Sequence, residues 1–371
     1  MISVLVAFLV SALLTYLVVR SAHHHSHLSG DSDTTGPQKF HSGSVPRIGG
    51  IGIVGGLVAA LSSQWQAHPD VVKLAALLLC CGAPAFIVGM AEDIFKNVSP
   101  RRRLVVTAFA AGLGVWLLDA TIDRTGIPGL DWVVSLAFGA ALVTVFVVAG
   151  VANAFNIIDG FNGLSSLCVA MALGTIAFVS FEVNDEALLL CALAGIGAVL
   201  GFFVWNFPFG KIFLGDGGAY FLGFYVAELA ILLLHRHPTV SPLFPLLVCI
   251  YPVFETVFSI YRKKFIRGMS PGVPDGVHLH MLIYKRIVRA PADTDAPQQQ
   301  SLRNSMTSPY LWVLCAGSLL PAMLFWESTV AMSTSILAFG FIYTLIYWQI
   351  VRFRVPRWLP SGRRRPATTK G

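Results

Sequence analysis

Long apolar segments recur along the whole chain, and they constrain the fold more than any other feature of the sequence. Only 12% of the 371 residues are charged, whereas soluble globular domains carry about 25%. Eleven segments are close to the ~20 residues that a helix needs to cross the ~30 Å hydrocarbon core of a bilayer. They are residues 1–20, 48–64, 73–91, 104–121, 131–151, 164–181, 187–206, 213–235, 241–261, 308–326 and 329–351. The sequence therefore predicts a protein that crosses the membrane many times.

The backbone of a membrane-spanning segment must satisfy its own hydrogen bonds, which restricts such segments to helices and closed barrels. These segments lack the strict alternation of apolar and polar residues that is typical of barrel strands. We therefore expect an all-α, polytopic membrane protein with about 11 transmembrane helices. Residues 1–351 are predicted to form one domain, followed by a basic tail at 352–371. The first segment lacks a charged start and a clear cleavage site, which favours an uncleaved helix over a signal peptide.

Lysine and arginine are distributed unevenly between the loops. If the helices alternate in direction, 23 of the 26 basic residues fall on one side, and only Lys73, Arg124 and Arg236 fall on the other. Loops that are rich in lysine and arginine face the cytoplasm. The N-terminus is therefore predicted to lie outside and the C-terminus in the cytoplasm. Such a basic surface suits anionic lipids and polyphosphate substrates, and nucleic acid is not needed to explain it.

The predicted cytoplasmic loops carry the polar clusters of the chain. These loops are residues 21–47, 92–103, 152–163, 207–217 and 262–307. One cluster is the pair Glu92 and Asp93 at the end of the third segment, followed by three arginines at 101–103. Neighbouring carboxylates repel each other unless a cation is close. The alternative is an ordinary solvated helix end. The tract "HHHSH" at 23–27 is interpreted as a solvated segment beside the membrane.

A second cluster, "NAFNIIDGFNG", lies between two apolar segments. Asn153, Asn156 and Asp159 are spaced by three and share one face if the preceding helix continues. Hard oxygen ligands at this spacing suit Mg²⁺, which takes one or two protein ligands together with phosphates. The alternative is a turn rich in asparagine and glycine, and the spacing alone does not decide between the two.

Two further clusters complete the set. Asp216 lies just inside an apolar segment, in the glycine-rich frame "FLGDGG", and an ionisable residue in such a position is a functional candidate. His278 and His280 lie in the longest loop, where they could bind a metal or clamp a phosphate together with Lys285 and Arg286. The segment "HLHMLIYKRIV" is predicted to form an amphipathic helix at the membrane surface.

Five ordered motifs, all on the predicted cytoplasmic side, carry a family resemblance. They are "VPRIGG", "GMAED", "NAFNIIDGFNGL", "FLGDGG" and "HLHM". Together with the segment count and the orientation, they resemble the polyprenyl-phosphate N-acetylhexosamine-1-phosphate transferases over about residues 1–350. That family includes the UDP-GlcNAc:undecaprenyl-phosphate enzyme and the phospho-MurNAc-pentapeptide translocase. The resemblance implies that undecaprenyl phosphate attacks the β-phosphorus of a UDP-sugar, giving a lipid-diphosphate sugar and UMP.

The resemblance also implies residue roles. Asn156 and Asp216 match the positions that hold Mg²⁺, with Mn²⁺ as an alternative. Catalytic roles fall to the carboxylates and histidines, which are Asp93, Glu92, His278 and His280. Substrate binding is assigned to Asp159, Gly160, Asn162, Asn206, Phe213, Arg47 and Arg103, with Phe213 stacking on uracil.

Two departures from the family pattern refine these expectations. Glu92 stands where the family usually has aspartate, so that Asp93 is the safer catalytic assignment. Met281 replaces the third histidine of the triple-histidine branch, which favours a GlcNAc-type enzyme that initiates O-antigen or another surface glycan. A base is not essential, because the second pKa of a phosphate monoester is near 6.

Other functions stay open at this point. A phospho-MurNAc-pentapeptide-type transferase is the alternative within the family, and a scaffold that has lost its activity would explain Glu92. A small-anion transporter is the alternative outside it, but transporters place polar residues near the midplane of broken helices. We expect a bacterial inner-membrane protein whose partners are a UDP-sugar, a polyprenyl phosphate and membrane lipid, with a homodimer as an option.

Overall fold

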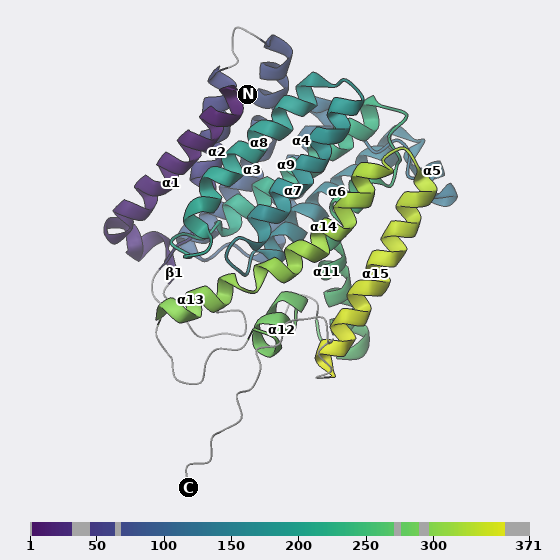
Figure 1. The fold of residues 1–371 in the computed structure, drawn as a ribbon. Helices are drawn as coiled ribbons and strands as arrows, with labels where there is room; N and C mark the ends of the chain where they lie inside the picture. The colour runs from purple at the N-terminus through teal and green to yellow at the C-terminus, as the bar shows by residue number, and fades with distance from the viewer. Residues whose placement is uncertain (1, 32–44, 64–67, 271–275, 289–296, 353–371) are drawn as a thin grey trace.

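The computed structural model describes residues 2–31, 45–63, 68–270, 276–288 and 297–352 (Figure 1). Side chains are not described for residues 24–31, 297 and 298. The basic tail beyond Arg352, residues 32–44 of loop 21–47 and the "HHHSH" side chains after His23 therefore lie outside the described part. The elements are α1 (Ile2–Ser29), β1 (Gly30–Asp31), β2 (Val45–Pro46), α2 (Gly50–Ser63), α3 (Pro69–Phe95), α4 (Pro100–Leu118), α5 (Pro128–Val134), α6 (Ala137–Ile158), α7 (Leu164–Glu182), α8 (Glu186–Asn206), α9 (Gly215–Arg236), α10 (Phe244–Val248), α11 (Ile250–Tyr261), the π-helix η1 (Arg262–Ile266), α12 (Leu279–Arg286), α13 (Pro297–Ser305), α14 (Ser308–Leu324) and α15 (Thr329–Val351).

The predicted all-α membrane class is confirmed, because every one of the expected apolar segments contains helix. Eight described helices are long and apolar enough to cross a membrane, judged by length and composition. The other three segments differ for physical reasons: α2 has only 14 residues, α4 carries three arginines in its first turn, and the ninth segment is interrupted at Cys249 between α10 and α11. The count of about 11 spans stays a prediction.

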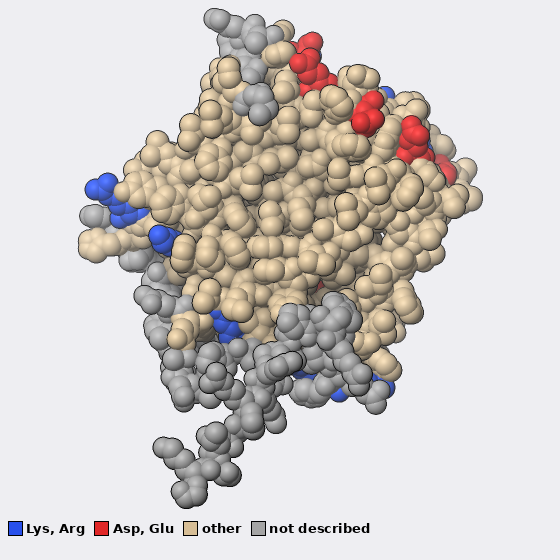
Figure 2. Space-filling view, viewed as in Figure 1, with Lys and Arg blue, Asp and Glu red and all other residues tan. Residues whose placement is uncertain are grey.

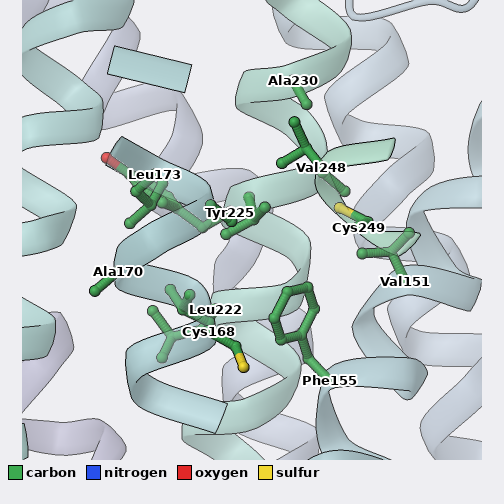
Figure 3. Close-up of a cluster of buried hydrophobic side chains, with 14 of the residues drawn as sticks. Val151, Phe155, Cys168, Ala170, Leu173, Leu222, Tyr225, Ala230, Val248 and Cys249 are labelled. Atoms are coloured by element: carbon green, nitrogen blue, oxygen red, sulfur yellow. The ribbon is translucent and has the colours of Figure 1, made fainter. Parts of the chain in front are cut away.

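Helix α9 is the centre of the fold. Its whole membrane-spanning window is buried inside the protein, and it packs against α3, α6 and α7. Figure 3 shows α9 side chains meeting those of the neighbouring helices. The labelled residues are Leu222, Tyr225 and Ala230 of α9, Val151 and Phe155 of α6, Cys168, Ala170 and Leu173 of α7, and Val248 and Cys249 near α10. A helix that is apolar and buried all round is expected at the core of a large bundle.

Glycines allow α9 to approach two other helices closely near its start. A Cβ atom placed on Gly89 of α3 would lie 2.4 Å from the Gly217 nitrogen of α9. A Cβ atom on Gly50 of α2 would lie 2.7 Å from the Gly218 nitrogen. Small residues permit such backbone approach in membrane bundles. The end of α3 and the starts of α2 and α9 therefore meet at one place.

Charged side chains separate towards opposite ends of the visible face. Figure 2 shows acidic residues along the upper right edge, whereas most of the visible lysines and arginines lie at the left and along the lower edge. The lower end carries α12 and α13 (Figure 1). This separation agrees with the uneven distribution of charge in the sequence, while the orientation in a membrane stays a prediction.

Arg124 binds the C-terminal end of α9. Its Nη1 donates to the carbonyl oxygens of Pro238 and Val240 at 3.0 and 2.9 Å, and its Nη2 donates to those of Leu234 and His237 at 2.7 and 2.8 Å. The last carbonyls of a helix have no partner within the helix, and a cation at this end also complements the helix dipole. Arg124 thus satisfies the helix terminus from outside.

We predict that Arg124→Gln lowers the free energy of unfolding by about 2–4 kcal/mol, because hydrogen bonds to charged groups contribute about 1.5–3 kcal/mol each and glutamine replaces only part of the set. The measurement is the thermal unfolding midpoint of the purified protein in detergent. Arg101→Gln, at an exposed arginine, is the control and should change the midpoint little. An Arg124→Gln midpoint equal to that of the control would contradict the clamp.

Candidate active site

Asp216 is the centre of a cluster of charged and polar side chains at the start of α9. Its Oδ1 accepts a hydrogen bond from Asn156 Nδ2 at 2.9 Å and lies 3.4 Å from Arg47 Nη2. Its Oδ2 is paired with Arg103 Nη1. Asp93 lies beside it, with Oδ1 3.6 Å from Arg47 Nε. We call these five residues the aspartate cluster; two carboxylates and two guanidinium groups balance within it.

Asp93 caps the start of α9 from the neighbouring helix α3. Its Oδ1 accepts from the Asp216 backbone nitrogen and its Oδ2 from that of Gly217, both at 2.9 Å. The first amides of a helix have no partner within the helix, and a carboxylate is favoured at this positive end of the dipole. Asp93 is 1% exposed. This carboxylate therefore fixes the direction in which α9 presents Asp216.

Arg47 reaches the aspartate cluster because its segment pairs with the turn before α9. The Phe213 nitrogen donates to the Pro46 oxygen at 2.8 Å, and the Gly49 and Gly50 nitrogens donate to the oxygens of Phe213 and Leu214 at 3.0 and 3.1 Å. These bonds join the motifs "VPRIGG" and "FLGDGG" residue by residue. The side chain of Arg47 then extends from this pairing towards both aspartates.

Arg103 reaches the cluster from the turn between α3 and α4. Lys96 ends α3 in the left-handed conformation, with φ at 54°, and Ser99 Oγ accepts from the Arg102 nitrogen at 3.4 Å to cap α4. Pro100 suits the first helical position because its missing N–H needs no partner there. The turn is short, so that Arg103, in the first turn of α4, lies against Asp216.

Residues 159–163, called the glycine loop here, follow α6 and lie next to the aspartate cluster. Asp159 is half-buried. Burial, with the nearby carboxylates of Asp216 and Asp93, raises the pKa of Asp159 well above its usual range, and Arg47 opposes this shift. Asn153, whose role the sequence left open, donates to the Ala149 oxygen of its own helix at 2.8 Å and thus braces α6.

Asn162 and Asn206 hold the glycine loop by bonds to protein groups. The Asn162 nitrogen donates to Asn304 Oδ1 at 2.8 Å, and its Nδ2 donates to Ser305 Oγ at 3.0 Å. Asn206 Oδ1 accepts from the Gly163 nitrogen at 2.6 Å, while its Nδ2 donates to the Ile212 oxygen at 2.7 Å. Both asparagines are buried. Their predicted contact with substrate stays a prediction, and the observed bonds give them a bracing role.

His278 and His280 lie on the other side of the glycine loop. Their rings are stacked, with centroids 5.2 Å apart and an interplanar angle of 4°. A Cβ atom on Gly160 would lie 3.6 Å from His280 Nε2, and the ring of Phe161 lies 5.5 Å from that of His280. The glycine loop therefore separates the aspartate cluster from the histidine pair, and contacts both.

His280 is fully buried, and neither of its ring nitrogens has a hydrogen-bond partner within the described part of the chain. Burial lowers the pKa of His280 to about 3, with the neighbouring Glu255 opposing the shift and His278 adding to it. The imidazole is therefore neutral at physiological pH. A buried polar group without a hydrogen-bond partner, beside a cluster of ionisable groups, is a functional candidate.

Glu92 was predicted to be catalytic, and the segment "HLHMLIYKRIV" was predicted to form a helix at the membrane surface. Glu92 is half-buried, and its Oε2 accepts from the Val98 nitrogen at 2.7 Å, so that it stabilises the α3–α4 turn beside the cluster. The predicted amphipathic surface helix is present as α12, but residues Leu279–Tyr284 are all buried. The surface position was wrong, because α12 packs against α15 and brings Tyr284 to 5.5 Å from the Phe161 ring. Phe213 is half-buried on the turn before α9.

Glu255 is a site residue that the sequence left without a role. Its Oε1 lies 2.9 Å from His278 Nδ1, and its Oε2 accepts from Tyr343 Oη at 2.7 Å. The signal for Glu255 was an ionisable residue within an apolar segment. No local signal pointed to Tyr343, because its partner lies 88 positions away in the chain.

The oxygen-bearing side chains of the aspartate cluster are suitable ligands for a hard divalent cation such as Mg²⁺. Within the described residues, no group of three or more His, Cys, Asp or Glu side chains is arranged as a metal site. Mg²⁺ needs fewer protein ligands, because substrate phosphates and water fill its remaining positions. The Asp216 carboxylate and the Asn156 amide are adjacent oxygen-bearing groups of the type that Mg²⁺ prefers. They fit a shared cation, which would take over the neutralisation that the arginines provide here.

The fold and the site together define a polytopic helical membrane protein with a cluster of paired carboxylates and guanidinium groups at one end of its bundle. The family model for glycosyl transferase family 4 matches residues 75–234. The "Undecaprenyl-phosphate alpha-N-acetylglucosaminyl 1-phosphate transferase" of Salmonella typhi is 30% identical over 259 residues, which are 67% of each chain. The chain belongs to glycosyl transferase family 4 and to its group of polyprenyl-phosphate N-acetylhexosamine-1-phosphate transferases.

Two other relatives extend the similarity. The "Probable undecaprenyl-phosphate N-acetylglucosaminyl 1-phosphate transferase" of Bacillus subtilis (strain 168) is 27% identical over 286 residues, which cover 76% of this chain and 77% of the relative. The "Undecaprenyl-phosphate alpha-N-acetylglucosaminyl 1-phosphate transferase" of Thermotoga maritima is 28% identical over 258 residues, which cover 69% of this chain and 73% of the relative. The family resemblance of the five motifs is thus confirmed.

Gly215 is the backbone position on which the aspartate cluster depends. Its φ is +77°, and a Cβ atom there would lie 1.9 Å from the Arg47 oxygen and 2.6 Å from Asp93 Oδ2. Both the left-handed conformation and the contact distances require glycine. A side chain at this position must displace Arg47, Asp93 or both.

We predict that Gly215→Ala lowers the activity of the protein at least ~100-fold, because it displaces the groups that surround Asp216. The measurement is turnover in the transfer assay described below, together with the unfolding midpoint. Gly112→Ala is the matched control: nothing lies within 4 Å of a Cβ atom at Gly112, and both properties should be kept. Wild-type turnover of Gly215→Ala would contradict the assignment.

Proposed function

We propose that this protein transfers N-acetylglucosamine-1-phosphate from UDP-GlcNAc to undecaprenyl phosphate, releasing UMP. The names of its relatives support this reaction and this lipid acceptor. The observation that carries the proposal is the environment of Asp216: an aspartate paired with two arginines and an asparagine amide, at one end of a membrane bundle. A reaction between two polyanions requires cationic groups that neutralise the phosphates, and a carboxylate can add to them by holding a divalent cation.

In the proposed reaction, an oxygen of the lipid phosphate attacks the β-phosphorus of the UDP-sugar. The bond between this phosphorus and the oxygen that bridges to the α-phosphorus breaks, and UMP leaves with the electron pair. Arg47 and Arg103 are proposed to neutralise the phosphates while they approach, since positioning and charge neutralisation supply most of the catalysis in phosphoryl transfer. Asp159 and Gly160, between the two clusters, are proposed to contact the nucleotide, and Phe213 to stack on its base.

We propose Mg²⁺ as the cofactor, held by Asp216 and Asn156. When bound, the cation would polarise the diphosphate and neutralise the leaving UMP. Asp93 is proposed to support the reaction by holding Asp216 and Arg47, since both of its oxygens are engaged with backbone amides. A base is not needed for the acceptor, because a phosphate monoester with a second pKa near 6 is largely dianionic at neutral pH.

The finer biological context is also a proposal. The basic loops favour an active site that faces the cytoplasm, where UDP-sugars are made. With the relatives from bacteria, this supports a place in the inner membrane. The pair His278 and His280, with Met281 in place of a third histidine, supports a GlcNAc-type enzyme that initiates O-antigen or another surface glycan.

The test is UMP release by the purified full-length protein with undecaprenyl phosphate and a panel of UDP-sugars. We expect UMP with UDP-GlcNAc and Mg²⁺, a lipid-diphosphate product, and loss of both with EDTA that is reversed by added Mg²⁺. UDP-MurNAc-pentapeptide separates the alternative within the family. A small-anion transporter releases no UMP, so folded protein without UMP from any UDP-HexNAc would overturn the proposal.

We predict that Asp216→Asn lowers kcat at least ~1,000-fold, because it removes the charge that holds the cation and both arginines. The apparent Mg²⁺ requirement of any residual activity should rise. Asp119→Asn is the matched control, since Asp119 is exposed at the far end of α4 in a left-handed conformation that asparagine also adopts. Near-normal turnover of Asp216→Asn would reject the metal role.

A further inference from the structure

A buried carboxylate anchors the histidine pair from behind. Glu255 of α11 is 0% exposed and receives three hydrogen-bond donors. Its Oε1 is 2.9 Å from His278 Nδ1 and accepts from the Leu279 nitrogen at 3.2 Å, while its Oε2 accepts from Tyr343 Oη at 2.7 Å. The Leu279 N–H can only donate, and a carboxylate without a proton accepts from all three partners at once. The ionised form fits this site, and an ionised carboxylate only accepts.

The proton shared with Glu255 therefore belongs to His278 Nδ1. This hydrogen bond selects one tautomer and one ring orientation, as carboxylates do for histidines in metal sites and catalytic triads. The opposite ring nitrogen, Nε2, is then turned away from Glu255. Since the ring of His280 stacks on that of His278, the same bond also steadies the ring that faces Gly160.

We propose that Glu255 is a positioning residue for sugar-phosphate transfer, which acts by holding His278, and through it His280, against the glycine loop. This inference rests on the proposed function and adds to it a residue outside the five family motifs. Tyr343 of α15 supports Glu255 in this role. α15, the last helix of the described residues, thereby contributes to the site from its membrane-spanning region.

A purely structural role for Glu255 is the competing interpretation, because this side chain links α11, α12 and α15. Other bonds already tie α12 to α15, however. Tyr347 Oη donates to the Val277 oxygen at 3.2 Å, and Arg286 Nη1 donates to the Ile350 oxygen at 2.7 Å. A buried charge is also a poor way to add stability, since apolar or neutral replacements are often neutral or better. The network is therefore explained better by the orientation of His278 than by attachment of α12.

The test compares Glu255→Gln, His278→Ala and the double variant in the UMP-release assay. We expect Glu255→Gln to lower kcat about 10–100-fold, the range seen when a carboxylate that orients a histidine is removed. The KM for UDP-GlcNAc should change less than about 3-fold, because the loss falls on the transition state. Glu228→Gln is the matched control: Glu228 is another fully buried glutamate, without a hydrogen-bond partner in the described part of the chain, and its turnover should not change.

The double variant separates positioning from stability. If Glu255 acts through His278, Glu255→Gln should cost less than about 2-fold once His278 is alanine, since the effects of coupled residues do not add. Tyr343→Phe removes only the outer bond and should give a smaller loss that also disappears in the His278→Ala background. It keeps the inference testable if Glu255→Gln does not fold. A full additional loss in the double variant, or wild-type kcat for Glu255→Gln, would overturn the positioning role.

The UMP release of the wild-type protein distinguishes a failure of the proposed function from a failure of the positioning role of Glu255. Wild-type protein that releases UMP while Glu255→Gln is unaffected rejects the positioning role alone. Folded wild-type protein that releases no UMP rejects the proposed function, and the inference fails with it.

Discussion

The rest of the site depends on the contact between the Asp93 carboxylate and the first amides of α9. α9 is buried all round, so that its positive end cannot be satisfied by water and needs a partner from the protein. Asp93 supplies it from α3. This places two aspartates side by side, which is costly unless cations lie close. Arg47 and Arg103 meet that requirement, and each is delivered by a separate segment of chain. One helix terminus thus explains why three distant motifs converge.

The sequence was informative wherever a residue conflicted with its apolar surroundings. Asp216 stood out in this way, and the spacing of Asn156 and Asp159 indicated a shared face. An ionisable residue in an apolar segment indicates a functional or structural role, but the sequence does not show which residue it contacts. The pairing of Arg47 with Asp216 spans 169 positions and depends on backbone bonds between two turns. No local pattern encodes that distance, so the contact could not be predicted from the residues alone.

Asn162 and Asn206 have structural partners that the sequence did not indicate. Asn162 and Asn206 were assigned to substrate binding because they match positions in the family motifs. In the structure they bond to Asn304, Ser305 and the Ile212 oxygen, while a contact with substrate stays a prediction. A loop beside a membrane bundle has buried backbone groups that must be satisfied, and asparagine can do this as well as bind a ligand. The α12 helix was misjudged for a related reason: its pattern allowed either a membrane or a protein to cover its apolar face, and α15 covers it.

These braces matter for function because the glycine loop lies between the aspartate cluster and the histidine pair. Asn206 holds it from α8, and Asn304 and Ser305 hold it from α13 through their bonds to Asn162. Trp312 Nε1 of α14 donates to the Gly163 oxygen at 3.1 Å. A loop fixed on several sides loses little entropy when ligand groups bind, so that both clusters can be aligned before the phosphates arrive. Glycine at position 160 leaves space beside His280 that a side chain would occupy. The backbone of the loop is therefore held on several sides, while the missing side chain at Gly160 leaves room beside His280.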